Sequence, residues 1–447
     1  MEQTMTQGNL AGILIRFSIP LVLSGILQQM YAWADAFIVG NLVGEDALAA
    51  VGATVSLYNL FVLVVTGLTL GVSILAAQMY GRGEREGLRP VLSTFAVVLG
   101  AAFLAVGLLG SLLAGPVLEL MSTTEDTIAM SRQYLEVVLL GLPVVAVYNV
   151  YAAVLRGMGE SRAPLYAVLV ASLVNVGVDL LLVGPANMGV RGAALATVAS
   201  QIMMTLFLMG YAVRRIPLLR FRPARGSVDR AALRAGLALG LPVAIQSSIN
   251  SLGSVVLQNF MNSFDSSRLV AAITTAYRVD TVILLPVTNL SSGISTVVAQ
   301  NIGARKPERA RKGLGVGLAI MLAMSIGLSA LVAVAGEPLI ALFGLTPEAS
   351  AMGGEFFRTL ALFYPVFGLG MALRGYLEGT GDVMWSSAIG ISALLLRIVL
   401  SYGLADWVGS PIIAYAEMAS WAAMLLLFAL RVLVRSRKAA ADSSQAA

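Results

Sequence analysis

The residues of this chain that could do chemistry are a few polar side chains inside long apolar stretches. Asp35 stands in QQMYAWADAFIVG, and Asn175 and Asp179 stand in SLVNVGVDLLLVG. On a helix, residues four apart project from one face, so Asn175 and Asp179 can bind one ion together. Thr197 and Asn149 would add a hydroxyl and a second amide. We therefore predict a cation site, H⁺ or Na⁺, formed by these five residues.

A cation would bind in this pocket because two carboxylates are buried there together, away from water. Burial disfavours the charged form of a carboxylate, and a nearby cation restores it. A carboxylate at bilayer depth costs about 2.5–3.5 kcal/mol on insertion scales, so it needs a partner, a cavity or a function. Oxygen ligands suit Na⁺ as well as H⁺, so the spacing does not choose between them. If the ion is Na⁺, its ligands would be Asp35, Asn175, Asp179 and Thr197.

Structural roles compete with the site at each position. A single intramembrane Asn or Thr commonly hydrogen-bonds between helices, and an Asp can mark the outer rim of a span. Asn149 lies nearer the cytoplasmic end of its span by simple counting. Further charges lie in the second half: Arg278, Asp280, Arg397 and Glu417. Of these, Arg278 and Asp280 either pair with each other or line the cavity.

The composition of the chain indicates whether water or lipid surrounds these residues. Of 447 residues, 58% are hydrophobic and only 12% are charged, and the mean hydropathy is +0.86. Soluble domains carry roughly 25% charged residues. The chain has no cysteine and no histidine, which excludes disulfides, thiol nucleophiles and imidazole ligands. We predict an all-α integral membrane protein that is not an enzyme and needs no cofactor.

A single offset of 222 residues superimposes the second half on the first. Pro242 then falls on Pro20, and GISTVVAQNIG (293–303) falls on GVSILAAQMYG (71–81). Likewise LEGTGD (377–382) falls on LRGMGE (155–160). A repeat on this scale determines the architecture, and duplicated halves are the usual construction of secondary transporters.

Each half contains six apolar stretches of membrane-spanning length, given that about 20 residues cross the hydrocarbon core. Stretches 2, 4, 8 and 10 are interrupted by Gly or Pro and could be broken. The expected limits are 13–39, 48–77, 91–114, 129–154, 163–184, 190–213, 235–260, 270–299, 313–335, 351–373, 384–405 and 411–433. We predict an N-terminal six-helix lobe (1–213), a basic cytoplasmic linker (214–234) and a C-terminal six-helix lobe with a short tail (235–447).

The positions of Lys and Arg along the sequence predict how the chain is oriented in the membrane. Most of the 29 basic residues fall at the two ends and in the connections after even-numbered spans. The positive-inside rule then places both termini in the cytoplasm, and we expect a multi-pass protein of the inner (plasma) membrane. This topology also explains the basic balance, so nucleic acid is not expected as a partner.

In its sequence, the chain resembles the multidrug and toxic compound extrusion (MATE) transporters over nearly its full length. The similarity rests on FSIPLVLSGILQQMYAWADAFIVGNLVG, AAQMYGRG, AQNIGARK, AYRVDTVILLP and GVRGAALATVASQ. It implies two pseudo-symmetric lobes of six helices forming a V. It also implies export of drug-like, often cationic, amphipathic compounds in exchange for H⁺ or Na⁺, and we expect a monomer.

The resemblance also suggests a branch of the family. In the DinF-like branch the cation site lies in the first lobe, and its pattern falls on Asp35, Asn175, Asp179 and Thr197, with Asn149 the weakest match. The NorM-like branch also uses carboxylates on spans 7 and 10, where this chain has Asn250 and the apolar surroundings of Phe363. Substrate binding is expected in an apolar and aromatic cavity with Gln246 and Asn250 as its polar groups.

Three other functions remain to be weighed. A lipid-linked precursor flippase of the same superfamily would share the fold, but it should have extra helices and a cationic central cavity. A membrane-embedded enzyme would need catalytic groups beyond the acidic pocket. A scaffold or channel would not need a buried acidic pocket in one half only.

Overall fold

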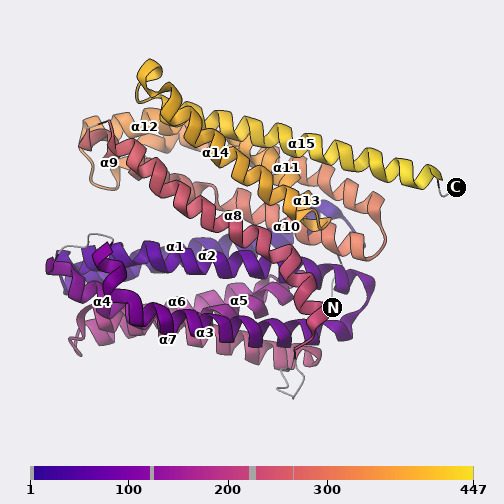
Figure 1. Ribbon diagram of the computed structural model, residues 1–447, viewed down its shortest axis with the longest axis horizontal. Coiled ribbons are helices and arrows are strands. Elements are labelled where there is room, and N and C mark those ends of the chain that lie inside the picture. Colours follow the sequence, from indigo (N-terminus) through magenta and orange to yellow (C-terminus); the bar gives the residue numbers. More distant parts are fainter. Residues whose placement is uncertain (1–4, 121–124, 221–227, 265, 446–447) are drawn as a thin grey trace. The chain divides into compact units, whose positions relative to one another are not determined.

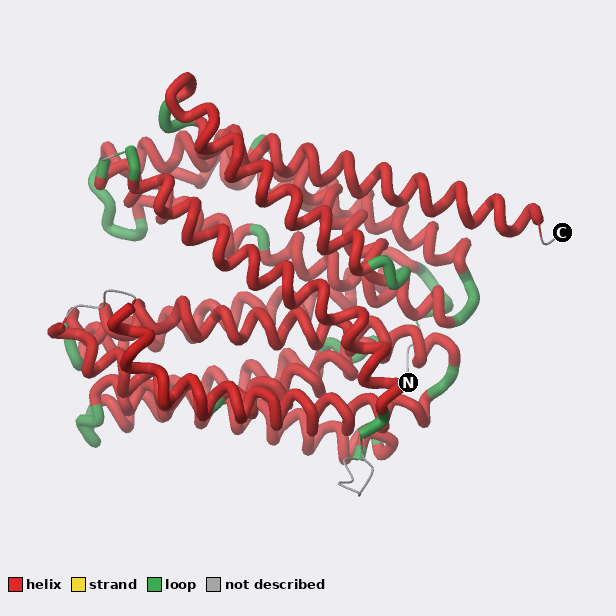
Figure 2. Tube along the Cα trace, in the orientation of Figure 1, coloured by secondary structure: helices red, strands yellow, loops and turns green. Residues whose placement is uncertain are grey.

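The computed structural model describes residues 5–120, 125–220, 228–264 and 266–445. Every regular element in these ranges is a helix, and no strand occurs in them (Figure 2). Residues 221–227 of the predicted linker, including Arg222 and Arg225, lie outside the described residues.

Fifteen α-helices follow one another along the described chain (Figure 1). Those of the first half are α1 (Leu10–Leu42), α2 (Glu45–Arg82), α3 (Leu88–Leu120), α4 (Glu125–Leu140), α5 (Leu142–Gly157), α6 (Arg162–Val183) and α7 (Gly189–Arg215). Those of the second half are α8 (Arg230–Asn262), α9 (Ser267–Ile283), α10 (Leu285–Gly303), α11 (Pro307–Ala341), α12 (Pro347–Ala361), α13 (Tyr364–Gly379), α14 (Val383–Val408) and α15 (Ile412–Gln445).

The helices account for the predicted number of membrane spans. Ten segments of the described chain are long and apolar enough to cross a bilayer unaided, one of them formed by α9 and α10 together. Two further spans are bent pairs, α4 with α5 at 42° and α12 with α13 at 49°. Counting each bent pair as one span gives up to twelve, six in each half. The all-helical membrane architecture predicted from the sequence is therefore confirmed.

Proline explains where the spans break. Pro143 and Pro365, equivalent under the 222-residue offset, stand at the starts of α5 and α13, and Pro286 stands at the start of α10. Proline has no N–H to donate to the preceding turn and is favoured in the first turn of a new helix. Spans 4, 8 and 10 are thus interrupted as expected, whereas span 2 is not, because α2 runs unbroken to Arg82.

Packing divides the chain into two compact units. Among the described residues, the first unit holds those of 19–247, and the second holds those of 5–18 and 248–447. Each unit therefore includes a short piece of the other half: the start of α1 belongs to the second unit, and the start of α8 to the first. The predicted lobe limits at 213 and 235 follow the repeat along the chain, and they stay a prediction.

Hydrogen bonds hold the N-terminal segment within the second unit. The Met5 amide donates to Gln300 Oε1 at 3.1 Å, and Asn301 Nδ2 donates to the Met5 carbonyl at 3.2 Å. Lys306 Nζ donates to the Thr6 carbonyl at 3.1 Å. These partners lie at the end of α10 and just after it, so Met5 and Thr6 are held there.

In the first unit, α8 approaches α2 through glycines. A Cβ atom added to Gly71 would lie 2.3 Å from the backbone nitrogen of Gly240, so only glycine fits this contact. Outward-facing side chains elsewhere are largely apolar; Leu120, for example, is 86% exposed. Contiguous apolar surface of this kind suits a lipid surrounding.

Candidate functional site

The predicted cation-site residues lie on four helices of the first unit. Asp35 is on α1, Asn149 on α5, Asn175 and Asp179 on α6, and Thr197 on α7. The helices α6 and α7 pack closely against each other, and α7 also packs against α4 and α5. Asn175 and Asp179 lie one turn apart on α6, as their spacing predicted.

Asp35 and Asp179 come together in the interior of this unit. Asp35 is 8% exposed and Asp179 is fully buried, and their carboxyl groups lie close enough to each other to interact electrostatically. Two ionised carboxylates cannot donate to each other. Only a proton on one of them, or a cation between them, can make this contact favourable.

Several polar atoms beside this pair have no hydrogen-bond partner among the described residues. They are both side-chain oxygens of Asp179, one of Asp35, and both the oxygen and the nitrogen of the Asn175 amide. Asn175 is only 1% exposed. Buried polar groups are nearly always paired, so this concentration of unpaired oxygens is chemically suited to a positively charged ligand.

Tyrosine hydroxyls surround the aspartates, and the sequence analysis did not single them out. Tyr134 on α4 hydrogen-bonds with Thr197 and lies close to both carboxylates. Tyr31 lies close to Asp35, and the Tyr58 hydroxyl accepts a 2.7 Å bond from Gln201. Tyr31 stands four residues before Asp35, a spacing visible in the sequence, but no spacing marks Tyr58 or Tyr134.

The structure leaves the predicted roles of three other residues open: Asn149, Gln246 and Asn250. The Asn149 amide donates to the Val145 carbonyl of its own helix at 2.9 Å, so its membership of the cation site stays a prediction. Gln246 is buried in the first unit, whereas Asn250, one turn further along α8, is exposed in the second. Their role in substrate binding also stays a prediction.

The second unit has a buried charged cluster of its own. Arg397 on α14 forms an ion pair with Glu417 on α15 at 3.1 Å. The Tyr277 hydroxyl on α9 donates to Glu417 at 2.7 Å and accepts from Arg397 at 2.7 Å. All three side chains are therefore bonded to one another, which indicates that this part of the cluster is structural.

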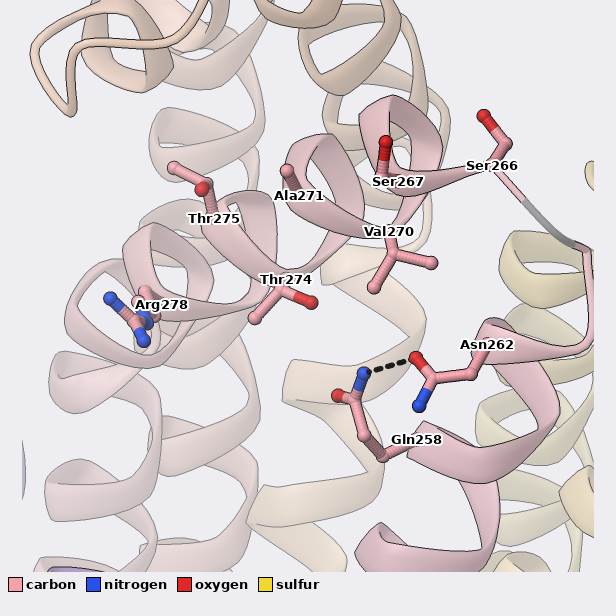
Figure 3. Close-up of a pocket in the computed structure, with 9 residues that line it drawn as sticks. All are labelled: Gln258, Asn262, Ser266, Ser267, Val270, Ala271, Thr274, Thr275 and Arg278. Atoms are coloured by element: carbon pink, nitrogen blue, oxygen red, sulfur yellow. Dashed lines mark hydrogen bonds between the residues drawn. The ribbon is translucent and has the colours of Figure 1, made fainter. Parts of the chain in front are cut away.

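Arg278 and Asp280, left open by the sequence, do not pair with each other. The Tyr364 hydroxyl on α13 donates to the Asp280 carboxylate, and Asp280 is buried. Arg278 instead lines an open cavity beside α8 (Figure 3). Arg278 therefore lines a cavity, whereas the bond of Asp280 to Tyr364 corresponds to neither interpretation.

The described residues contain no group of three or more His, Cys, Asp or Glu side chains that could hold a metal ion. A cation at Asp35 and Asp179 would take further oxygen ligands from Asn175 and Thr197. That small, all-oxygen set keeps both H⁺ and Na⁺ as candidates.

Comparison with known families decides what kind of protein contains this site. The MatE family profile matches residues 20–181 and again residues 242–403. The chain belongs to the MatE family. The two matched segments are offset by 222 residues, the repeat visible in the sequence.

Relatives of this MatE protein match it along most of their length. It is 26% identical over 405 residues to the probable multidrug resistance protein YpnP of Bacillus subtilis, covering 90% of each chain. It is 29% identical to the probable multidrug resistance protein YoeA of the same organism, covering 88% of this chain and 89% of that one. A protein of Shewanella oneidensis named as an FAD transporter is 26% identical, with 87% and 86% covered.

Solved structures share the fold. A MOP superfamily transporter from Pyrococcus furiosus, described as having a binding pocket of reverse polarity, matches with a TM-score of 0.89 and 21% identity over 97% of this chain and 98% of that one. An outward-facing multidrug resistance MATE transporter matches with a TM-score of 0.88 and 21% identity over 96% and 97%. The protein is thus a multi-pass membrane transporter of the multidrug efflux family and not an enzyme, while its assignment to the DinF-like branch stays a prediction.

Proposed function

We propose that this protein is a secondary active antiporter that exports amphipathic, often cationic compounds in exchange for H⁺ or Na⁺ by alternating access. The relatives named as multidrug resistance proteins support the substrate class. The relative named as an FAD transporter makes flavin nucleotides a further class to include in export assays.

The observation that carries the antiport proposal is the buried contact between Asp35 and Asp179. With both ionised, the two negative charges repel each other in a setting of low dielectric constant, where repulsion is strongest. One H⁺ or Na⁺ removes that repulsion. The unpaired oxygens of Asn175 and Asp179 provide places for the ion to bind.

Ion binding can drive a conformational change because it alters which packing is most stable. With the ion bound, the carboxyl groups of Asp35 on α1 and Asp179 on α6 can stay next to each other. Without it, their repulsion favours separation of these helices. A ligand shifts an equilibrium only through such a difference in affinity between two states, and here the difference comes from one positive charge.

The distribution of basic residues supports an orientation with both termini in the cytoplasm and location in the inner (plasma) membrane. With that orientation the ion enters from outside, where its electrochemical potential is high, and is released inside. We further propose that one chain, acting as a monomer, carries out the whole cycle.

Proteoliposomes test the proposal directly. The purified protein is reconstituted, and ethidium transport is recorded with an H⁺ gradient alone, a Na⁺ gradient alone, both or neither. Transport driven by one gradient and lost in Asp35→Asn identifies the coupling ion. Equal transport in all four conditions would rule out antiport.

The lipid-linked precursor flippase is not favoured. None of the relatives described above is named for lipid-linked precursors, and the counted spans do not exceed twelve. The buried acidic pair of the first unit is also unsuited to a pyrophosphate.

A further inference from the structure

An open cavity lies between the outer ends of α8 and α9, entirely within the second unit (Figure 3). Its volume is about 820 Å³, within the range of about 300–1,000 Å³ typical of small-molecule sites. Nine described residues line it, and among these nine there is one cation, Arg278, and no acid. This polarity is opposite to that of the acidic pair in the first unit.

Most of the lining side chains can donate hydrogen bonds. The polar ones include Gln258, Asn262, Ser267, Thr274 and Thr275. The Gln258 amide nitrogen donates to the Asn262 amide oxygen at 3.2 Å, which leaves the Asn262 NH₂ group available as a donor. The buried Thr274 hydroxyl has no partner among the described residues.

Arg278 supplies the charge from inside the membrane span. Eleven residues separate it from Ser267 at the start of α9, which is about 16 Å along a helix. It lies one turn beyond Thr274, on the same face of α9, and it is exposed. A cation at this depth costs roughly 2.5–3.5 kcal/mol unless a negative group meets it.

Most arginines elsewhere on α9 and α12–α15 have such a partner. Six others on α9 and α12–α15 form ion pairs with carboxylates. They are Arg268, Arg358, Arg374, Arg397, Arg431 and Arg435. Arg278 forms no ion pair within the part of the chain that the structure describes. Asp280, two residues on, is bonded to Tyr364.

We propose that this cavity binds the anionic group of a small molecule, a phosphate or a carboxylate, with Arg278 as its counter-charge. A guanidinium presents paired N–H donors that match two oxygens of such a group. The Asn262 amide and the Thr274 hydroxyl bind the remaining oxygens. The protein then accepts amphipathic compounds bearing negative charge as well as cationic ones.

This inference deepens the proposed function by adding a substrate class, and its test does not need an ion gradient. Riboflavin and flavin mononucleotide share one fluorescent ring system and differ by a phosphate, so the pair isolates the anionic group. Their affinities are measured by fluorescence anisotropy on the purified full chain in nanodiscs of phosphatidylcholine.

In the expected result, Arg278→Ala weakens flavin mononucleotide binding about tenfold or more, equivalent to about 1.4 kcal/mol, and leaves riboflavin binding unchanged. Arg278→Lys keeps the charge and loses less. Arg268→Ala removes the same charge from α9 at its exposed ion pair with Glu348 and leaves both affinities unchanged. An unaltered ratio of the two affinities in Arg278→Ala would overturn the proposal.

Two further experiments distinguish a lipid headgroup from a small molecule as the bound anion, and this binding proposal from the antiport proposal. If phosphatidylglycerol in the nanodisc lowers flavin mononucleotide affinity in the wild type but not in Arg278→Ala, a lipid headgroup also occupies the site. If it does not, the small molecule is the source of the anion. Ethidium export by Arg278→Ala, driven as in the proteoliposome assay, continues at the wild-type rate. Absence of gradient-driven export in the wild type would instead refute the antiport proposal and leave the binding result standing.

Discussion

Asp35 on α1 and Asp179 on α6 lie close to each other in the interior of the first unit. Neither carboxylate has a basic side chain to neutralise it among the ion pairs of the described chain. A contact between two acids is favourable only when a positive charge is shared by them. On the proposed mechanism, the stability of this contact depends on an H⁺ or Na⁺ that the protein gains and loses.

Replacing either aspartate should uncouple transport. Asp35→Asn and Asp179→Asn each remove one negative charge, so the pair no longer repels and no longer requires an ion. We expect gradient-driven ethidium export to fall to background, with membrane insertion unchanged. Ser172→Ala, on α6 and bonded within its own helix at 2.8 Å, is the matched control. Normal export by either Asn variant would show that its aspartate has no coupling role.

Replacing Asn175 with an apolar residue should raise the stability of the protein and lower its affinity for the ion. Neither atom of its buried amide has a partner in the described structure, and an unsatisfied buried polar group costs about 1–3 kcal/mol. Asn175→Leu should therefore raise the thermal unfolding midpoint in detergent. It should also raise the ion concentration needed for half-maximal export, because an oxygen ligand is lost. A lower midpoint with an unchanged ion requirement would mean that Asn175 only holds helices together.

The sequence predicted the architecture because two strong signals agreed. Apolar stretches of spanning length and a constant 222-residue offset are both properties of the chain order, so neither needs tertiary information. The broken spans were predictable only in part. Proline marked the breaks before α5, α10 and α13, whereas glycines in α2 caused none, because Gly71 serves a close approach to Gly240 instead.

Residues of the candidate site were predictable where a charged side chain inside the membrane carries a high free-energy cost. Asp35 and Asp179 stood out for that reason, and the structure brings them together. Tyr58 and Tyr134 did not, because tyrosine is common in membrane helices and its hydroxyl acquires a role only through packing. The pairing of Arg397 with Glu417, and the lack of a partner for Arg278, likewise depend on contacts between distant helices.

The ion pair of the second unit should behave as a structural unit. Removing one partner of a buried pair costs about 3–5 kcal/mol, while replacing both with apolar groups can be nearly neutral. Arg397→Leu and Glu417→Leu should each lower the thermal unfolding midpoint, and the double variant should recover most of the loss. Fluorescence-detected size-exclusion chromatography after heating measures this. Additive losses in the double variant would contradict a structural pair.

Equivalent glycines of the two halves should tolerate substitution differently. A Cβ at Gly71 meets the Gly240 backbone, whereas a Cβ at Gly293 meets the Ser18 hydroxyl at 2.5 Å, a side chain that can rotate away. Overpacking typically costs about 1–3 kcal/mol, so Gly71→Ala should lose folded yield and thermal stability, and Gly293→Ala clearly less. Gly210→Ala, with nothing within 4 Å of its Cβ, is the control. Equal losses at Gly71 and Gly293 would contradict the rigid backbone contact.

The proposed orientation can be tested with little background because the chain contains no cysteine. Gln7 and Glu45 are both exposed, and the basic-residue distribution places Gln7 in the cytoplasm and Glu45 outside. We expect a membrane-impermeant maleimide to label Glu45→Cys on intact cells, and Gln7→Cys only after permeabilisation. Ethidium export by each variant confirms that it is folded. Labelling of Gln7→Cys on intact cells would reverse the orientation, and with it the direction in which the ion bound at Asp35 and Asp179 must travel.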